Sequence, residues 1–420
     1  MKKLYPDQAM VIKQSIFEIF SEENTSGVAY KNKSFKRAII NHLDQTGNTT
    51  ITDLAQELNI SVPKITSLIN ELITDGLVQD DGKEDSKGGG RKANLYGLVA
   101  DSAFFLGVDV KHYYINIGLL DFKKNLVKQE MHVPYLLVNT KEAFDQLVKI
   151  IQTFIANLPE EHRNILALCL NLSGRINSEN GYSYSFFHFH EEPLSATIEK
   201  ITGIRTFLEN DSRAMAYGEF HNGLVREEKN VLFVNMDYGI GLGIMIDGQI
   251  YRGKSGFGGE FGHIPLFANE IICHCGKKGC LETEASGQAL IRLFREKIEQ
   301  GSSSALMQKN KLPEKLQLTD IIQAAKNEDV LCIELIAEIG EKIGRGISVL
   351  INIFNPELVI LGGILAETGD YIRLPIRSAL NKYSLSLVNN DTQLHMSKLQ
   401  EKAGVIGGCL IARDKLLSVK

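Results

Sequence analysis

The chain has 420 residues, of which 44% are hydrophobic and 23% are charged. This length provides two or three globular domains with buried cores, and the composition excludes disorder, collagen-like repeats and a small disulfide-rich fold. The formal net charge of −5 does not indicate a nucleic-acid partner. No segment resembles a signal peptide or has the roughly eighteen apolar residues of a membrane span. We therefore expect a cytoplasmic protein with no membrane partner.

An amphipathic segment over residues 9–20 opens the chain. Its apolar residues recur at helical spacing. We expect it to pack either on the later domains or between subunits, and the pattern does not choose between these two places.

Residues 1–98 are expected to form a first domain of short helices joined by polar turns. Helical spacing of apolar residues predicts a helix over 33–46. A second helix is expected over 53–58, with Thr52 placed to cap it, and the turn at 59–60 leads into a third helix. This order is typical of a trihelical unit.

The third helix has the polarity of a helix that reads the major groove of DNA. Ser61 can cap it, and its apolar side chains form one stripe. The outward polar side chains are candidate DNA contacts: Ser61, Lys64, Thr66, Ser67 and Asn70. Segments 77–79 and 94–98 are then predicted to pair as a hairpin, so that the domain is a winged helix-turn-helix.

The charge of the first domain and the sequence of its hairpin tip give opposite indications about DNA binding. Residues 1–100 carry 12 Lys and Arg against 13 Asp and Glu, and three short helices also occur in protein-interaction modules. The tip over 87–92 favours DNA, because its glycines allow close approach to a phosphate and Arg91 can enter a minor groove. The alternative for the tip is an ordinary flexible linker.

From residue 104 onward, β-rich apolar segments alternate with helical periods, which predicts a mixed α/β fold. The expected strands are 104–110, 114–120, 165–172, 230–236, 243–246 and 358–361, and the expected helices are 141–157, 289–300 and 329–354.

Four potential metal ligands follow the pattern H-x9-C-x-C-x4-C: His263, Cys273, Cys275 and Cys280. Three of the six cysteines crowd into eight residues, which favours a metal over a disulfide framework. The set suits a closed tetrahedral Zn²⁺ site, in which the ion is structural because no water is bound for chemistry. His274 is expected to point away from the ion. The alternative is three reduced cysteines beside an unrelated histidine.

The residues around this cluster resemble the signature of the ROK family of repressors, open reading frames and sugar kinases. A sugar-binding Glu-Asn-Asp, a glycine-rich phosphate turn and a late nucleotide-side motif also look like those of the family. The matching segments are 209–211, 238–243, 258–263, 273–282, Ser286 and 355–363. The resemblance covers about residues 103–415, and the winged helix matches the repressor branch.

The resemblance implies an actin-like, two-lobed ATPase fold with a sugar in the cleft between the lobes. The first lobe would span 101–222, completed by a C-terminal helix over 404–420, and the second would span 223–403 with the zinc knuckle. The family's sugar contacts fall on five positions: Asn210, Asp211, Glu260, His263 and Glu282.

The residue types at these positions suit a polyol, because each hydroxyl needs a donor and an acceptor. His263 would bind zinc through one nitrogen and the sugar through the other. Two alternatives stay open: Asn210 and Asp211 could merely cap the helix that follows, and Glu282 could be a surface carboxylate.

The resemblance also bears on catalysis. In the kinases of the family, the aspartate at the position of Asp211 is the general base, so a base is present. The kinases carry Asp-x-Gly-Gly-Thr-Lys where this chain has Asp-Val-Lys-His-Tyr-Tyr at 109–114, and Gly-Thr-Gly-Ile-Gly where it has Asp-Tyr-Gly-Ile-Gly at 237–241. Bulky side chains and an added carboxylate would weaken the phosphate contacts. The retained sugar set and eroded nucleotide set predict a sensor derived from an enzyme.

Two further features have an open interpretation. Arg175 could meet a phosphate on the ligand or form a surface ion pair. The aromatic and His-rich segment 186–190 could close over a sugar or pack between the lobes.

The expected function is a sugar- or sugar-phosphate-responsive transcriptional regulator, most often a repressor in this family. It would bind operator DNA as a homodimer or homotetramer, since two-fold operators require at least two subunits. The alternative is a ROK-type ATP-dependent sugar kinase with an appended domain, and residual kinase activity in a regulator is a third possibility. The sequence does not identify the effector, the operator or the sign of regulation.

Overall fold

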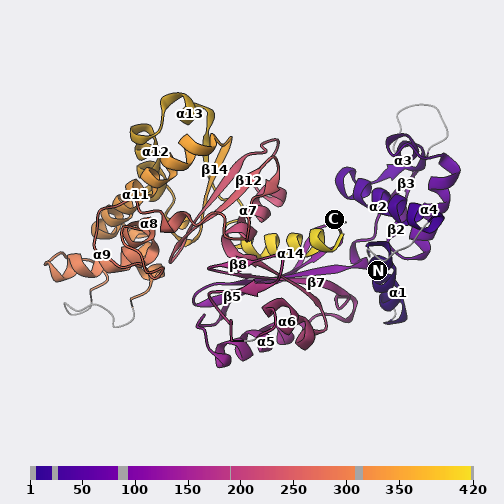
Figure 1. The fold of residues 1–420 in the computed structure, drawn as a ribbon, viewed down its shortest axis with the longest axis horizontal. Coiled ribbons are helices and arrows are strands. Elements are labelled where there is room, and N and C mark those ends of the chain that lie inside the picture. Colours follow the sequence, from indigo (N-terminus) through magenta and orange to yellow (C-terminus); the bar gives the residue numbers. More distant parts are fainter. Residues whose placement is uncertain (1–5, 21–26, 84–92, 190, 308–315, 418–420) are drawn as a thin grey trace.

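The computed structural model describes residues 6–20, 27–83, 93–189, 191–307 and 316–417. It has a small N-terminal domain followed by two five-stranded sheets, and the helices α7 (Asp211–Asn222) and α14 (Lys402–Leu417) lie between the sheets (Figure 1). The N-terminal domain lies beside the first sheet and far from the second (Figure 1).

The N-terminal domain is a winged helix-turn-helix, as predicted. Its strands pair antiparallel in the order β1-β3-β2. The elements are α1 (Pro6–Phe20), α2 (Val28–Thr46), β1 (Thr49–Thr50), α3 (Ile51–Glu57), α4 (Val62–Thr74), β2 (Val78–Lys83) and β3 (Asn94–Leu98). The buried stripe of α4 consists of Ile65, Leu68, Ile69 and Leu72, as its spacing predicts.

Three local expectations in this domain were wrong. The helix predicted from residue 33 begins at Val28. Thr50, not Thr52, caps α3, because its Oγ1 accepts a hydrogen bond from the Asp53 amide at 3.1 Å. Ser61 stands at the start of α4 but makes no capping hydrogen bond with its side chain.

The amphipathic segment at the start of the chain forms α1, which packs on α2 in the core of the N-terminal domain. Ile12, Ile16 and Ile19 are buried there. Gly76 lies so close to Ile12 that an added Cβ would sit 3.3 Å from its side chain. The structure therefore places this segment within the winged-helix domain, a third place that the sequence pattern did not suggest.

The first large sheet has the strand order β10-β7-β4-β5-β6. Side chains alternate along β4: Phe104, Leu106 and Val108 face a core shared with α5 and α6, whereas Phe105 faces the core shared with α14. The elements are β4 (Phe104–Val110), β5 (Tyr114–Asp121), β6 (Leu126–Pro134), α5 (Lys141–Ala156), β7 (Ile165–Leu172), α6 (Leu194–Thr202), β10 (Arg205–Asn210) and α14 (Lys402–Leu417).

The second large sheet has the order β13-β12-β11-β14-β15. Leu232 and Val234 face the helices α8 to α12, and Phe233 faces the side where α7 packs. No helix in the described parts of the chain is long and apolar enough to cross a membrane. The elements are α7 (Asp211–Asn222), β11 (Val231–Met236), β12 (Ile240–Ile246), β13 (Gln249–Ile250), α8 (Leu281–Ala285), α9 (Gly287–Glu299), α10 (Leu318–Lys326), α11 (Val330–Phe354), β14 (Leu358–Gly362), α12 (Asp370–Tyr383), α13 (Ser386–Asp391) and β15 (Gln393–Met396).

Glycines bring α7 and α14 into backbone contact. A Cβ added to Gly407 of α14 would lie 1.8 Å from the carbonyl oxygen of Ala214, and one added to Gly218 of α7 would lie 2.3 Å from that of Ala403. No carbon atom fits at such distances. The two helices therefore form one rigid pair that joins the two sheets.

We expect Gly407→Ala to destabilise the protein, because the added methyl group must push α14 away from α7. Overpacking of this kind costs about 1–3 kcal/mol. The midpoint of thermal unfolding, followed by circular dichroism, should fall by several degrees. Lys149→Ala, on the exposed face of α5, is the control and should change the midpoint little; equal midpoints for both variants would contradict the close packing.

Candidate functional site

A cleft of about 630 Å³ opens between the two sheets at the point where β10 ends and α7 begins. All five predicted sugar contacts line it, together with side chains of the eroded nucleotide loops. Its walls include Lys111, His112, Arg175, Tyr184, Phe186, His188, Asn210, Asp211, Asp237, Tyr238, Glu260, His263, His274 and Glu282.

Asn210 lies at the joint between β10 and α7 and uses both ends of its amide. Its Oδ1 accepts hydrogen bonds from the amides of Ser212 and Arg213 at 3.1 and 3.2 Å, and its Nδ2 donates to the carbonyl of Gly174 at 3.1 Å. The capping role considered from the sequence is confirmed for Asn210. The same residue lines the cleft, so the two roles do not exclude each other.

Asp211 is the first residue of α7 and also lines the cleft. Its Oδ1 accepts a hydrogen bond from the Ser212 amide at 2.8 Å, and its Oδ2 lies 3.5 Å from the Nδ2 of Asn235. The position suits a carboxylate, because the amides at a helix start favour negative charge.

Glu282 is not a surface carboxylate, since its side chain is only 14% exposed. Its Oε2 accepts a hydrogen bond from the Ile240 amide at 3.0 Å, and its Oε1 lies 3.1 Å from Nδ1 of His274. A Cβ at Gly239 would lie 2.6 Å from the carboxylate. Glu282 therefore ties α8 to the start of β12, and a side chain at position 239 would displace its carboxylate.

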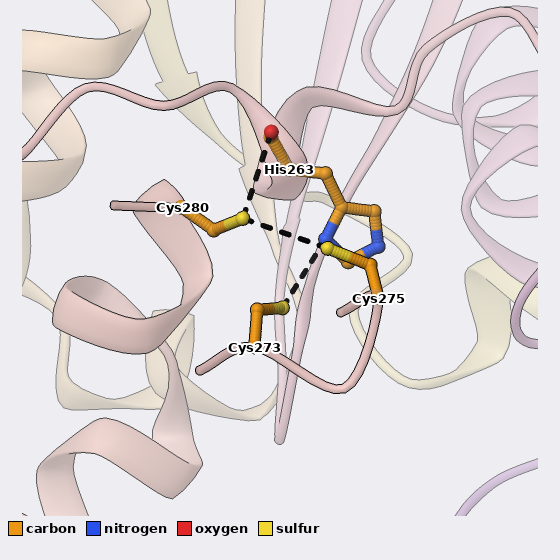
Figure 2. A group of neighbouring side chains, drawn as sticks. All are labelled: His263, Cys273, Cys275 and Cys280. Carbon is orange, nitrogen blue, oxygen red and sulfur yellow. Dashed lines mark hydrogen bonds between the residues drawn. The ribbon is translucent and has the colours of Figure 1, made fainter. Parts of the chain in front are cut away.

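The four predicted metal ligands are brought together (Figure 2). The Sγ of Cys273 lies 3.6 Å from Nδ1 of His263, and the Sγ atoms of Cys275 and Cys280 are 3.6 Å apart. Tetrahedral Zn²⁺, with bonds of about 2.0–2.3 Å, needs its ligand atoms about 3.5–3.8 Å apart. The spacing and the donor types therefore fit a metal ion of this kind.

His263 and His274 lie next to each other at the edge of the cluster. Nδ1 of His263 faces the cysteines, while its Nε2 lies 3.8 Å from Oε2 of Glu260, on the side of the cleft. The expectation that His274 points away was wrong: its Nδ1 is 3.8 Å from the Cys273 Sγ, and its ring meets that of His263 edge-on at 5.0 Å. Residues 274 and 275 form a turn, so strand alternation does not apply there.

The first eroded nucleotide loop places a buried lysine at the floor of the cleft. The Nζ of Lys111 lies 3.3 Å from Oδ2 of Asp109. Burial alone favours the neutral amine, but Asp109, Asp211 and Asp237 together raise the pKa of Lys111 above its ordinary value. The three neighbouring aspartates therefore favour the charged form of the lysine.

Three aromatic rings join the two eroded loops. The rings of His112 and Tyr113, after β4, lie 5.6 and 5.0 Å from that of Tyr238, before β12. The rings of His112 and Tyr113 are 4.4 Å apart. The loop after β4 and the loop before β12 thus face each other through aromatic side chains.

A buried ion cluster beside Asn210 was missed by the sequence reasoning. Glu209 is fully buried, and its carboxylate lies 2.7 Å from Nε of Arg213 and 2.8 Å from Nε of Arg252. Burial opposes ionisation, but the two arginines lower the pKa of Glu209 to about 2. Arg213 also donates to the carbonyl of Gly256 at 2.8 Å. The cluster therefore joins the start of α7 to the loop 251–260, which carries Glu260.

Arg175 and the segment 186–190, whose roles the sequence left open, lie partly in the cleft wall and partly in the core. Arg175 is exposed and lines the cleft, as does His188. Phe187 is 1% exposed and packs against Phe144 of α5 at 5.7 Å. It therefore lies in the core of the first lobe, neither over the cleft nor between the lobes as the sequence suggested. His190 lies outside the described residues.

The candidate DNA contacts lie on α4. Ser61, Ser67 and Asn70 are exposed, and Lys64 and Thr66 are half-buried. Glu71, one turn further along, is held by Lys36 at 3.1 Å, which offsets an acidic charge on the helix. Arg91 lies outside the described residues.

Comparison with known proteins assigns both parts of the chain. The ROK family matches residues 105–415. The chain belongs to the ROK family. A winged helix-turn-helix DNA-binding family matches residues 34–79, over α2 to β2.

Relatives include both regulators and kinases. A xylose repressor of Caldicellulosiruptor bescii is 28% identical over 369 residues, 87% of this chain and 92% of the relative. A glucokinase of Thermotoga maritima is 29% identical over 314 residues, 74% of this chain and 98% of the enzyme. The crystal structure of a ROK family transcriptional regulator, a homologue of the E. coli Mlc protein, superposes with a TM-score of 0.77 at 27% identity, covering 92% of this chain and 97% of that one.

We expect Asn210→Ala to cost about 1 kcal/mol of unfolding free energy, the usual contribution of a helix cap. Asn210→Asp keeps a capping oxygen and should cost less, although it loses the donor to Gly174. Urea unfolding followed by tyrosine fluorescence compares the two variants. Equal losses in the two variants would mean that the tie to Gly174, which both variants lose, holds this joint rather than the cap.

Proposed function

We propose that this protein is a sugar- or sugar-phosphate-responsive transcriptional regulator, acting as a repressor, that works on operator DNA in the cytoplasm. The observation that carries the proposal is a cleft with polyol-binding side chains in the same chain as a winged helix-turn-helix. Repressors named for xylose and N-acetylglucosamine among its relatives support it. In the proposed division, residues 1–98 bind DNA. Residues 101–222 together with 404–420 form the first lobe of the sensor, and residues 223–403 form the second.

The proposed sugar contacts are Asn210, Asp211, Glu260, His263 and Glu282. They support a carbohydrate ligand because amide, carboxylate and imidazole groups converge from both lobes on one cleft. Arg175 on the same wall provides positive charge for a phosphorylated sugar.

Non-catalytic sensing is supported by the side chains in the two loops that would contact a nucleotide. The Lys111 ammonium group lies among Asp109, Asp211 and Asp237. In phosphoryl transfer, the positive charge at such a place comes from a divalent ion that binds together with the nucleotide. The Tyr238 ring packs on Tyr113 in the loop after β4. Tyr238 itself stands in a turn where a bound phosphate would need a small residue. The alternative, a ROK-type sugar kinase, is favoured by Asp211 at the base position and by the relationship to glucokinase.

We further propose that the His263, Cys273, Cys275 and Cys280 cluster holds structural Zn²⁺. All four positions are taken by protein ligands, which leaves no place for water on a tetrahedral ion. The ion would hold His263 toward Glu260 and fix the segment that leads to Glu282, so that zinc orders three of the proposed sugar contacts.

The proposed assembly is a homodimer or homotetramer, because a two-fold operator is bound by two winged helices. Apolar side chains are exposed where α11, α12 and α13 meet, which supports contact with a second copy there. These residues are Ile353, Phe354, Tyr383, Leu385 and Leu387.

The function is tested by fluorescence anisotropy on a duplex from upstream of the protein's own coding region, at stated salt. The panel is D-xylose, D-glucose, N-acetylglucosamine and their phosphates. We expect tight binding, release by one sugar, and no binding after removal of residues 1–100. In parallel, ADP formation with ATP and each sugar should stay at background. Sugar-dependent ADP formation that Asp211→Asn abolishes would establish the kinase alternative instead.

Elemental analysis by mass spectrometry should find about one zinc per chain. Cys275→Ser should lose the metal and weaken sugar binding in calorimetry about 10- to 100-fold, the usual effect of disturbing the support of a metal site. Cys332→Ser changes a buried cysteine of α11 and should keep both. Unchanged sugar affinity in a zinc-free Cys275→Ser protein would disprove the coupling between the ion and the cleft.

A further inference from the structure

The cleft and the DNA-binding domain are joined by an uninterrupted series of contacts through α7 and α14. α7 begins at the cleft with the Asn210 cap. At a rise of roughly 1.5 Å per residue, Tyr217 lies about 10 Å further along the helix. Its hydroxyl donates to Oδ2 of Asp414 in α14 at 2.6 Å.

The next residue along this series is Arg413, which reaches into the N-terminal domain. Its guanidinium donates to Oδ1 of Asp414 at 3.1 Å and to Oδ1 of Asp44, in α2, at 2.6 Å. The arginine is 4% exposed and the aspartate 15% exposed. Charge-assisted hydrogen bonds with little water around them depend strongly on geometry, so this contact is sensitive to small movements of α14.

Asp44 is held from a second side by Lys124, which follows β5 of the first sheet. The Nζ of Lys124 lies 2.8 Å from Oδ2 of Asp44. One carboxylate of the winged-helix domain thus has one cation on α14 and one in the connection between β5 and β6 of the first sheet. A shift of α14 relative to that connection would change the geometry of these two ion pairs.

The arrangement around Arg413 is not fully satisfied. Within the described part of the chain, its buried Nε has no hydrogen-bond partner. A buried donor without an acceptor is costly. A rearrangement of α14 that gave Nε an acceptor would recover this cost, and such a compensation is what a two-state element needs.

At the other end, the cleft can act on α7 from both lobes. Asn210 and Asp211 belong to the start of α7, whereas Glu260 belongs to the loop 251–260, which Arg213 holds through the Gly256 carbonyl. A ligand that contacts both the loop and the helix binds best at one particular separation between them. It therefore has different affinities for different lobe arrangements, which a ligand needs in order to shift an equilibrium.

We propose that Tyr217, Asp414, Arg413 and Asp44 form the contact series by which an occupied cleft repositions the winged-helix domain. Because the glycine contacts leave no free space between α7 and α14, a displacement at the cleft end of α7 is passed to Arg413 instead of being absorbed. Tyr217 and Asp44 are positioning residues, and neither lines the cleft. The proposal rests on the sugar-responsive DNA-binding function above.

The test measures the ratio of operator affinities without and with sugar. Wild type, Asp44→Asn, Tyr217→Phe and the double variant are titrated on the upstream duplex, with each sugar of the panel at saturation. Sugar affinity is measured separately by calorimetry. Asp75→Asn is the matched control, because this aspartate pairs with Lys36 inside the N-terminal domain at 3.3 Å.

We expect both single variants to bind sugar as wild type does but to lose about fivefold or more of the affinity ratio, the scale of a typical coupling between sites. The double variant should lose no more than the larger single loss, because residues in one series are not additive. Asp75→Asn should keep the ratio.

Each other outcome has a definite meaning. Folded single variants with the wild-type ratio would overturn the contact series while leaving the proposed function intact. Fully additive losses would mean that Tyr217 and Asp44 act separately, which also overturns it. A wild-type protein that ignores both DNA and sugar would instead refute the proposed function, and the series with it.

Discussion

The close backbone contact between α7 and α14 is the constraint on which the rest of the structure depends. Gly218 and Gly407 allow two helices from distant parts of the sequence to lie against each other with no side chain between them. The two sheets pack on opposite sides of this pair. The cleft, the ion cluster at Glu209 and the contact with the winged-helix domain are all placed by one or the other of these helices.

The cleft shows how one helix start serves structure and recognition together. Helix starts need acceptors for their free amides, and Asn210 and Asp211 provide them. The cluster of His263 and three cysteines lies on the facing side, next to Glu260. Another part of the cleft has a different character, because a buried lysine and the rings of His112 and Tyr238 line it.

The mixed α/β class and the Cys/His cluster were predictable because their signals are local, whereas the two-lobed fold and the five cleft positions came from the resemblance to the ROK family. The spacing of His263 and the three cysteines, the apolar stripe of α4 and the alternation of strands with helices each depend on neighbours within a few turns. The ion cluster was not predictable, because Glu209 pairs with Arg252 as well as with Arg213, and Arg252 comes from the other lobe. The direction of the His274 side chain was mispredicted, because the prediction assumed the alternation of a strand and residues 274 and 275 form a turn. The place of α1 depends on Gly76, more than fifty residues later in the chain.

The order of elements along the chain has a consequence for how the protein forms during synthesis. Cys409 of α14 donates to the carbonyl of Gly118, in β5, across 291 residues of sequence. One face of the first sheet therefore has no cover until the ribosome has made nearly all of the second lobe, and contacts of such long range form slowly. The apolar residues on that face, Phe105 among them, depend until then on other protection from aggregation. A nascent chain can complete its winged helix early, yet it cannot hold that domain through Arg413 before α14 has emerged.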